Sequence, residues 1–396
     1  MLAAILIFAG TYLVLAIGRI PFLRVDRTGA AIVGASLMLA FNVLTVEEAY
    51  AAINYDTIIL LFGMMIVVAN LRLSGFFATV AAWVVDHAHG PLVLLSGIVL
   101  VSGVFSAFFV NDTMCLVLTP LVLDITRRLG RKPIPYLLAV AMSSNIGSVA
   151  TMTGNPQNMM IGSFSHIPYR TFAATLAPIA VVGLALTIAV ISLVYRAEFR
   201  LRVPLQVQHR AVRVNRPLLG KSLAVSAGMI VFFFAGWPVP KVAVIAGALL
   251  LLTRRVKPEK IYREIDWSLL VLFIVIAGLE KTPVSAGLFA AAGRFHLDRT
   301  GPLSVFAALL SNLVSNVPAV LVFQTFVPHL ADPARAWMAL AMSSTLAGNL
   351  TLLGSVANLI VVQRARAEVD ISFGEYARAG VPLTVLTLAA GVWMLN

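Results

Sequence analysis

The chain has 396 residues, of which 60% are hydrophobic and only 12% charged, with a formal net charge of +12 and a single cysteine. Soluble domains carry about 25% charged residues, so this composition excludes a soluble protein and predicts a polytopic membrane protein. A single cysteine excludes an internal disulfide and a cysteine-based metal site. Because the basic residues fall in short loops between apolar segments, we attribute the net charge to membrane topology and expect no nucleic-acid partner.

The first spans follow from the apolar segments and the basic loops between them. Residues 2–18 are predicted to be a span rather than a cleaved leader, because they lack a basic start and a small-x-small cleavage site. The arginines that follow place the next loop in the cytoplasm and the N-terminus outside. Further spans are expected at 29–44 and 56–71, and residues 74–89 are expected to form an interfacial arm.

Two unusual segments complete the first half. Residues 91–125 are apolar, hold a polar tip at Asn111–Thr113 and precede a basic loop, which predicts a re-entrant hairpin. Residues 133–162 are predicted to form a helix that breaks near Gly154–Pro156, because proline lacks an N–H and clashes with the preceding turn. Broken backbone at membrane depth is tolerated only where protein buries it or a watery cavity solvates it. A span at 171–195 follows.

The second half repeats this order after a basic cytoplasmic linker at 196–221. The sequence AMSSNIGSVATMTGNPQN at Ala141 matches AMSSTLAGNLTLLGSVAN at Ala341, and VNDT at Val110 matches SNVP at Ser315. The matching segments are spans at 222–236, 242–253, 267–279 and 376–395, an interfacial arm at 284–297, a hairpin at 302–327 and a broken helix at 336–362.

An odd number of spans in each half requires the second half to insert upside down. The predicted fold is therefore an all-α polytopic membrane protein with about ten transmembrane helices and two re-entrant hairpins. It is an inverted repeat of about five plus five spans, with two broken helices. The first repeat covers residues 1–195 and the second covers residues 222–396.

The candidate binding site lies where the two hairpin tips meet the two broken helices. Half-helix N-termini suit an anion or an oxygen-rich solute, whereas unwound carbonyls suit a cation such as Na⁺. Asp112 is the only carboxylate at the middle of an apolar segment, so we assign it the coupling proton or cation. The candidate residues are Asn111, Asp112, Thr113, Asn145, Gly154, Asn155, Asn158, Ser315, Asn316, Asn349, Gly354, Ser355 and Asn358.

Polar residues of these types also have structural roles in membrane helices. Asparagine, serine and threonine also hold membrane helices together, and a lone asparagine in a span has this role more often than a binding role. The histidines have no ligand spacing, so no metal site is expected. No phosphate-binding glycine loop and no HExxH or GxSxG motif occurs, which argues against ATP drive within the chain, against a cofactor and against an intramembrane enzyme.

Five motifs carry a resemblance that covers nearly the whole chain. They are LLFGMMIV at Leu60, NDTMCLVLTP at Asn111, TGNPQN at Thr153, SNLVSNVPAVL at Ser311 and GNLTLLGSVANLIV at Gly348. Together they resemble the ion transporter superfamily of arsenite efflux permeases, citrate and dicarboxylate transporters, silicon efflux transporters and some sodium/proton antiporters. Dicarboxylate members use a Ser-Asn-Thr signature, whereas the two tips here read Asn-Asp-Thr and Ser-Asn-Val, more like the arsenite permeases.

The resemblance implies a scaffold unit and a transport unit, an elevator-like motion and a homodimer; it does not require Cys115 as an arsenite ligand. We predict a secondary active transporter of a small anion or oxyanion (arsenite-type, inorganic or carboxylate), coupled to H⁺ or Na⁺ by alternating access. The predicted location is the inner membrane of the cell, with both termini outside. The alternative is a Na⁺/H⁺ antiporter of the same superfamily. Substrate, direction and an ATPase partner stay open.

Overall fold

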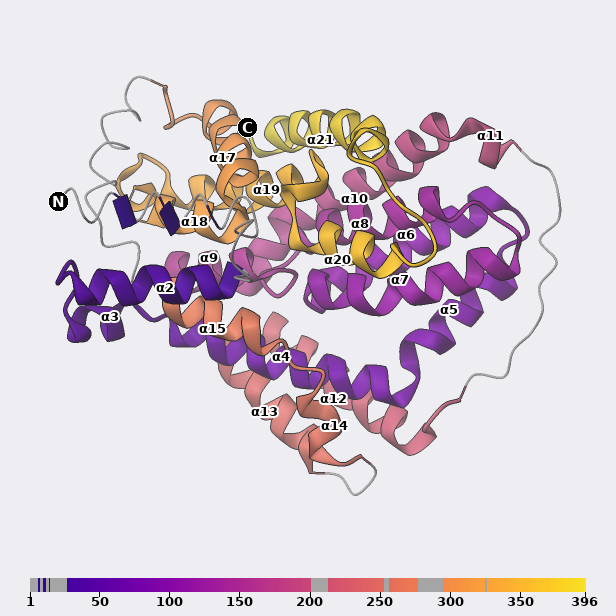
Figure 1. Ribbon diagram of the computed structural model, residues 1–396, viewed down its shortest axis with the longest axis horizontal. Helices are drawn as coiled ribbons and strands as arrows, with labels where there is room; N and C mark the ends of the chain where they lie inside the picture. The colour runs from indigo at the N-terminus through magenta and orange to yellow at the C-terminus, as the bar shows by residue number, and fades with distance from the viewer. Residues whose placement is uncertain are drawn as a thin grey trace.

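The computed structural model describes residues 27–200, 213–252, 256–276, 295–324 and 326–396, with isolated positions before residue 27 (Figure 1). Within these ranges the chain forms helices and turns, and no strand. Five of the helices are long and apolar enough to cross a membrane, and shorter apolar helices accompany them. Most of the predicted span at 2–18, residues 201–212 of the basic linker and most of the arm at 284–297 lie outside the described residues.

The first half follows the expected order of helices. Its apolar segments form helices because they are long and continuous, and two of these helices tolerate an interior proline, Pro120 in α7 and Pro178 in α10. The elements are α2 (Arg27–Ala40), α3 (Val46–Ala52), α4 (Tyr55–Ser74), α5 (Phe76–His87), α6 (Pro91–Phe108), α7 (Asn111–Arg128), α8 (Pro133–Ser148), α9 (Pro156–Ser165), α10 (Tyr169–Val194) and α11 (Arg196–Phe199).

The second half has a corresponding set. Its first helix begins at Arg216, inside the predicted linker, because Asn215 caps it and Pro217 occupies its first turn. The elements are α12 (Arg216–Phe234), α13 (Val239–Leu251), α14 (Pro258–Tyr262), α15 (Trp267–Ile276), α17 (Thr300–Val314), α18 (Asn316–Gln324), η2 (Val327–His329), α19 (Pro333–Leu346), η3 (Ala347–Asn349), η4 (Leu352–Gly354), α20 (Val356–Ala365) and α21 (Phe373–Leu395).

Both predicted hairpins are helix pairs with short tips. The chain reverses at Phe109 and Val110 between α6 and α7, and at Ser315 between α17 and α18. In Figure 1 the pair α6–α7 extends to the right and the pair α17–α18 lies to the left, so their tips approach each other near the middle. Ser315 has a φ of +80°, a region that favours glycine, so the second tip stores backbone strain.

The first broken helix ends earlier than the proline predicts. The first segment stops at Ser148, and Pro156 is the first residue of α9 rather than a break within a helix. Proline is favoured at this position because its missing N–H has no helical partner there. Asn155 caps α9 by accepting a hydrogen bond from Asn158 N at 2.8 Å. The break therefore covers residues 149–155, and the predicted position near Gly154–Pro156 is its C-terminal end.

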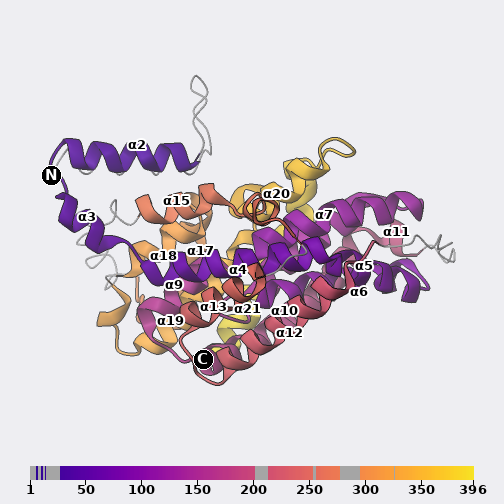
Figure 2. The same ribbon diagram turned by 90° about the horizontal axis from the view of Figure 1, so that it is seen from below.

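Packing divides the described helices into two groups. An outer group contains α2, α4, α12, α13 and α15, with α13 and α12 against α4 and α2 against α15. An inner group contains α6 to α10 and α17 to α21, with α6 against α8, α17 against α19 and α10 against α21. Figures 1 and 2 show α4, α12 and α13 running together along one side of the molecule. The functional residues predicted above all belong to the inner group.

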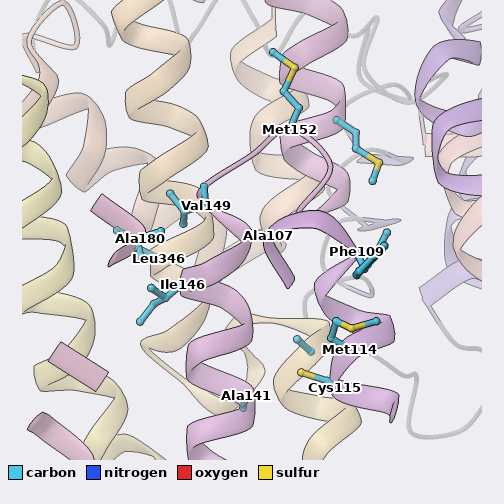
Figure 3. Packing of buried hydrophobic residues seen from close by; sticks show 14 of the residues in the cluster. Ala107, Phe109, Met114, Cys115, Ala141, Ile146, Val149, Met152, Ala180 and Leu346 are labelled. Carbon is cyan, nitrogen blue, oxygen red and sulfur yellow. The ribbon is translucent and has the colours of Figure 1, made fainter. Parts of the chain in front are cut away.

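The inner group is tightly packed around the first break. A Cβ on Gly147 would overlap the backbone of Gly103, so the glycine lets α8 and α6 approach closely. Figure 3 shows Ile146 and Val149 of the first half beside Leu346 of the second, and all three side chains are fully buried. This apolar shell encloses the polar residues of the breaks, and such close packing keeps them in one arrangement.

Candidate functional site

A cavity of about 60 Å³ lies where the hairpin tips meet the broken helices. One water-sized group needs roughly 10–15 Å³ by a comparable measure, so the cavity holds a few such groups, or one small solute. Its walls come from both tips, from the first residues of α9 and α20, and from α15. The lining residues are Asn111, Asp112, Pro156, Gln157, Leu269, Leu272, Ser315, Asn316, Val317, Pro318, Ser355 and Val356.

Four helix N-termini converge on this cavity. The helices α7, α9, α18 and α20 begin at Asn111, Pro156, Asn316 and Val356, and all four residues line it. Each helix N-terminus carries unpaired N–H groups and about half a positive charge from the aligned peptide dipoles. The cavity therefore suits an anion or the oxygen atoms of a polar solute.

Asp112 is the only charged side chain among the residues that line the cavity. Asp112 lies half-buried in the first turn of α7, and the described lining residues include no arginine, lysine or histidine. A carboxylate is favourable beside a helix N-terminus, so Asp112 offsets part of the positive potential. The site combines neutral amides and hydroxyls, positive backbone ends and one titratable group.

Asn145 connects the elements behind the cavity. Its Nδ2 donates to Asn349 Oδ1 at 2.9 Å and to Asn358 Oδ1 at 3.0 Å. Its Oδ1 accepts from Asn111 Nδ2 and from Ser355 Oγ, each at 3.1 Å. This fully buried amide thus binds the first hairpin tip to the second break. Because both the oxygen and the nitrogen of the Asn145 amide have two partners each, this amide makes the local structure rigid.

The two breaks are held by the same contact in each half. Asn158 Nδ2 donates to the carbonyls of Ser148 and Thr151 at 3.0 and 3.1 Å. Asn358 Nδ2 donates to the carbonyls of Gly348 and Thr351 at 2.7 and 3.1 Å. A helix end leaves carbonyls without partners, and these asparagines supply donors where water is excluded. Their role in the structure is to position the breaks.

Each tip is also fastened to a break. Asn111 N donates to the Gly154 carbonyl at 2.9 Å. The Asn316 amide satisfies its surroundings when its nitrogen faces the Gly354 and Ser344 carbonyls, both at 3.2 Å, and its oxygen accepts from Gln157 Nε2 at 3.3 Å. Hydrogen bonds therefore join each tip to a break.

The structure divides all but one of the predicted residues into two groups. Asn111, Asp112, Ser315, Asn316 and Ser355 line the cavity. A second group lies behind it in the network, and Thr113 belongs to neither group. Cys115 is fully buried and does not line the cavity. No group of three or more metal-ligating side chains occurs among the described residues. The second group comprises Asn145, Gly154, Asn155, Asn158, Asn349, Gly354 and Asn358.

Seven of the lining residues were missed by the sequence analysis, and three of them show why. Gln157 is 3% exposed and donates from Nε2 to Thr345 Oγ1 at 3.2 Å. The position that matches Gln157 in the second half is an alanine. The comparison of the two halves therefore gave no indication that Gln157 belongs to the site. Leu269 and Leu272 look like lipid-facing residues of an apolar span, and only the packing of α15 places them on the cavity.

Comparisons with known proteins were made for the whole chain. The family model described as a citrate transporter (CitMHS) matches residues 12–334. The silicon efflux transporter LSI3 of Oryza sativa subsp. japonica is 30% identical, over 95% of this chain and 94% of that protein. The "46 kDa membrane protein" of Mycobacterium leprae is 29% identical over 99% of this chain and 97% of that protein. A Dictyostelium discoideum protein named arsB is 22% identical over 93% of this chain and 87% of that protein.

A solved structure shares the fold. The YdaH transporter of Alcanivorax borkumensis superposes with a TM-score of 0.59 at 14% identity, over 100% of this chain and 96% of that one. The helical architecture is thus that of a known membrane transporter. The predicted resemblance to the ion transporter superfamily and the all-α polytopic fold class are confirmed.

Proposed function

Because this chain belongs to the citrate transporter family, we propose that it is a secondary active transporter of a small anion or oxyanion, coupled to H⁺ or Na⁺. The observation that carries the proposal is the convergence of four helix N-termini on a small cavity that contains one carboxylate. Helix N-termini bind oxygen-bearing solutes, and they do so without a cationic side chain that would hold an anion too tightly for release.

The size of the cavity favours a small inorganic solute over a tricarboxylate. About 60 Å³ of space, walled by Leu269 and Leu272, accommodates a few water-sized groups. A relative that matches 95% of this chain carries the name silicon efflux transporter, which is consistent with a small hydroxylated substrate. Arsenite and silicic acid both offer O–H groups to Asp112 and oxygen atoms to the backbone N–H groups.

Coupling is assigned to Asp112. It is the only carboxylate among the lining residues, so it can carry a proton or ligate a cation as the solute binds. Its neighbour Asn111 has an Oδ1 atom that is buried and has no hydrogen-bond partner in the described structure. An acceptor of this kind suits a solute O–H or a coupling cation.

The proposal is tested with purified protein in liposomes. Uptake of arsenite, silicic acid, sulfate and citrate is measured under an imposed pH gradient and, separately, under an imposed Na⁺ gradient. We expect uptake of a small oxyanion or its acid to follow one gradient and citrate uptake to be weaker. Failure of all four solutes to move under either gradient would contradict the proposal.

A Na⁺/H⁺ antiporter is the second candidate, favoured by the unpaired Asn111 Oδ1 beside Asp112. The same liposomes distinguish the two. An internal pH dye that responds to external Na⁺ without any added anion indicates the antiporter. A dye response that requires the oxyanion indicates coupled oxyanion transport.

A further inference from the structure

Gln157 is the second residue of α9, and it differs in kind from its counterpart in the second half. The two breaks align residue by residue, so that Asn158 matches Asn358, which makes the same contacts with its own break. One residue earlier, Gln157 matches Ala357. Gln157 lines the solute cavity, whereas Ala357 does not. The first half therefore brings an amide side chain to the cavity at a place where the second half brings none.

Two protein partners fix the nitrogen of the Gln157 amide. Nε2 donates to Thr345 Oγ1 at 3.2 Å and, in the orientation that satisfies the Asn316 amide, to Asn316 Oδ1 at 3.3 Å. An amide nitrogen carries two hydrogens, so these two bonds use both of them. The oxygen, Oε1, accepts no hydrogen bond from another described residue, although the side chain is only 3% exposed. Oε1 is thus the atom of Gln157 that is left for a solute in the cavity.

The first half contributes three side-chain acceptors to the lining of the cavity. Besides Gln157 Oε1 they are the carboxylate of Asp112 and Asn111 Oδ1, which is buried and has no hydrogen-bond partner in the described structure. The nitrogen of the Asn111 amide is already used, because Nδ2 donates to Asn145 Oδ1 at 3.1 Å. The lining residues of the second half are mainly apolar: Leu269, Leu272, Val317, Pro318 and Val356.

We infer that Gln157 is a specificity-determining residue whose Oε1 accepts a hydrogen bond from an O–H group of the solute, so that the site binds a hydroxy acid in its protonated form and rejects a fully ionised oxyanion. The inference rests on the proposed transport function and names the form of the solute at that same site. The helix N-termini donate to solute oxygen atoms, whereas the three side-chain acceptors require solute O–H groups. A hydroxy acid with intact O–H groups satisfies both sets.

A fully ionised oxyanion such as sulfate satisfies only one of these sets. Its oxygen atoms pair with backbone N–H groups, but they leave Gln157 Oε1 and Asn111 Oδ1 without donors and are repelled by an ionised Asp112. A site built to hydrogen-bond a substrate hydroxyl rejects an analogue that lacks it, because buried polar groups of the site are then unpaired. The loss of one such contact changes an affinity by about tenfold.

Equilibrium binding tests the inference without any gradient. Arsenite, which carries O–H groups at neutral pH, and sulfate are titrated onto the purified full chain in detergent. The wild type is compared with Gln157→Met, which keeps the length of the side chain but has no amide oxygen. We expect the wild type to bind arsenite at least about tenfold more tightly than sulfate, and Gln157→Met to lose about tenfold of that preference through weaker arsenite binding. The ratio is measured on one preparation, so it does not depend on the folded fraction.

A second variant, Gln157→Glu, separates recognition of the solute from support of the structure. Glutamate keeps an acceptor oxygen but has no N–H for Thr345 and Asn316, so a purely structural role predicts the same loss as in Gln157→Met. We expect Gln157→Glu to keep a preference for arsenite at least as large as that of the wild type, because a carboxylate also repels sulfate. The matched control is Gln363→Met, an exposed residue of α20 outside the cavity, which should leave both affinities unchanged.

The inference is overturned if the wild type shows no preference for arsenite over sulfate, including no binding of either. It is also overturned if Gln157→Met keeps the preference of the wild type, or if Gln157→Glu loses it as fully as Gln157→Met. Uptake into liposomes separates this result from the proposed function. If the preference depends on Gln157 but no solute moves under either gradient, the proposed function fails while the inference stands. If Gln157→Met accumulates arsenite and excludes sulfate as the wild type does, the function stands and the inference fails.

Discussion

At the scale of single residues, the site separates binding from positioning. The side chains of Asn111, Asp112 and Asn316 line the cavity, whereas Asn145 holds the breaks from behind. Composition and the repeat predicted which polar residues gather here, because polar groups at membrane depth need partners. They did not predict which of those residues face the cavity, because that depends on the path of the backbone through each break.

Replacing Asn145 with alanine should destabilise the protein strongly. The change leaves donors on Asn111 and Ser355 and acceptors on Asn349 and Asn358 without their partner, and each buried unpaired group costs about 1–3 kcal/mol. We expect a clear fall in the midpoint of thermal unfolding in detergent. An unchanged midpoint would show that the network does not hold the breaks.

A buried ion pair gives a second prediction. Arg131 and Glu198 lie 2.9 Å apart with side chains 7% and 5% exposed, and Tyr136 donates to Glu198 at 3.3 Å. Replacing Glu198 with glutamine leaves a buried unpaired cation and should cost about 3–5 kcal/mol of folding free energy. The control is Asp124→Asn in the exposed pair with Arg128, which should cost less than about 1 kcal/mol. Equal shifts in unfolding temperature for Glu198→Gln and Asp124→Asn would contradict the larger cost expected for the buried pair.

At the scale of elements, helix pairs and interrupted helices lie where the sequence predicts hairpins and broken helices, but the helices end at other residues than predicted. The motif TGNPQN signals a break because proline and asparagine favour helix boundaries. The chain leaves the helix at Ser148, a residue with no helix-breaking character. The reason is tertiary: Asn155 and Asn158 side chains bond the Ser148 carbonyl at 3.3 and 3.0 Å and stabilise the early end.

This origin of the break predicts different effects for two neighbouring substitutions. Gly154→Ala should be damaging, because a Cβ there would overlap the Ser148 backbone, and overpacking of this kind costs about 1–3 kcal/mol or more. Pro156→Ala should cost less than about 1 kcal/mol, because Pro156 is the first residue of α9 and alanine is tolerated there. Thermal unfolding of both variants shows which of the two substitutions destabilises the protein more. A larger loss of stability for Pro156→Ala would contradict this explanation of the break.

At the scale of the whole molecule, packing crosses between the halves. Helix α13 of the second half packs on α4 of the first, α2 of the first packs on α15 of the second, and α20 runs along α7. The repeat in the sequence indicates two consecutive units. It does not indicate that helices of one unit pack mainly against helices of the other. Neither half can bury its apolar and polar surfaces without the other.

Separated halves should therefore be unstable alone. We expect residues 1–195 and 196–396, produced as two chains, to be degraded singly and to assemble when they are produced together, because α4 and α15 each lack their main partner otherwise. The measurement is co-purification through a tag on one half. Stable accumulation of either half by itself would contradict the importance of the crossed packing.

The central claim is that the cavity at Asp112 carries coupled transport of a small solute. The most direct measurement is arsenite uptake into liposomes by the wild-type protein and by Asp112→Asn, under a pH gradient and under a Na⁺ gradient. The account predicts that the variant folds normally and exchanges arsenite across the membrane, but no longer accumulates it under either gradient. Accumulation by Asp112→Asn equal to that of the wild type would contradict the account.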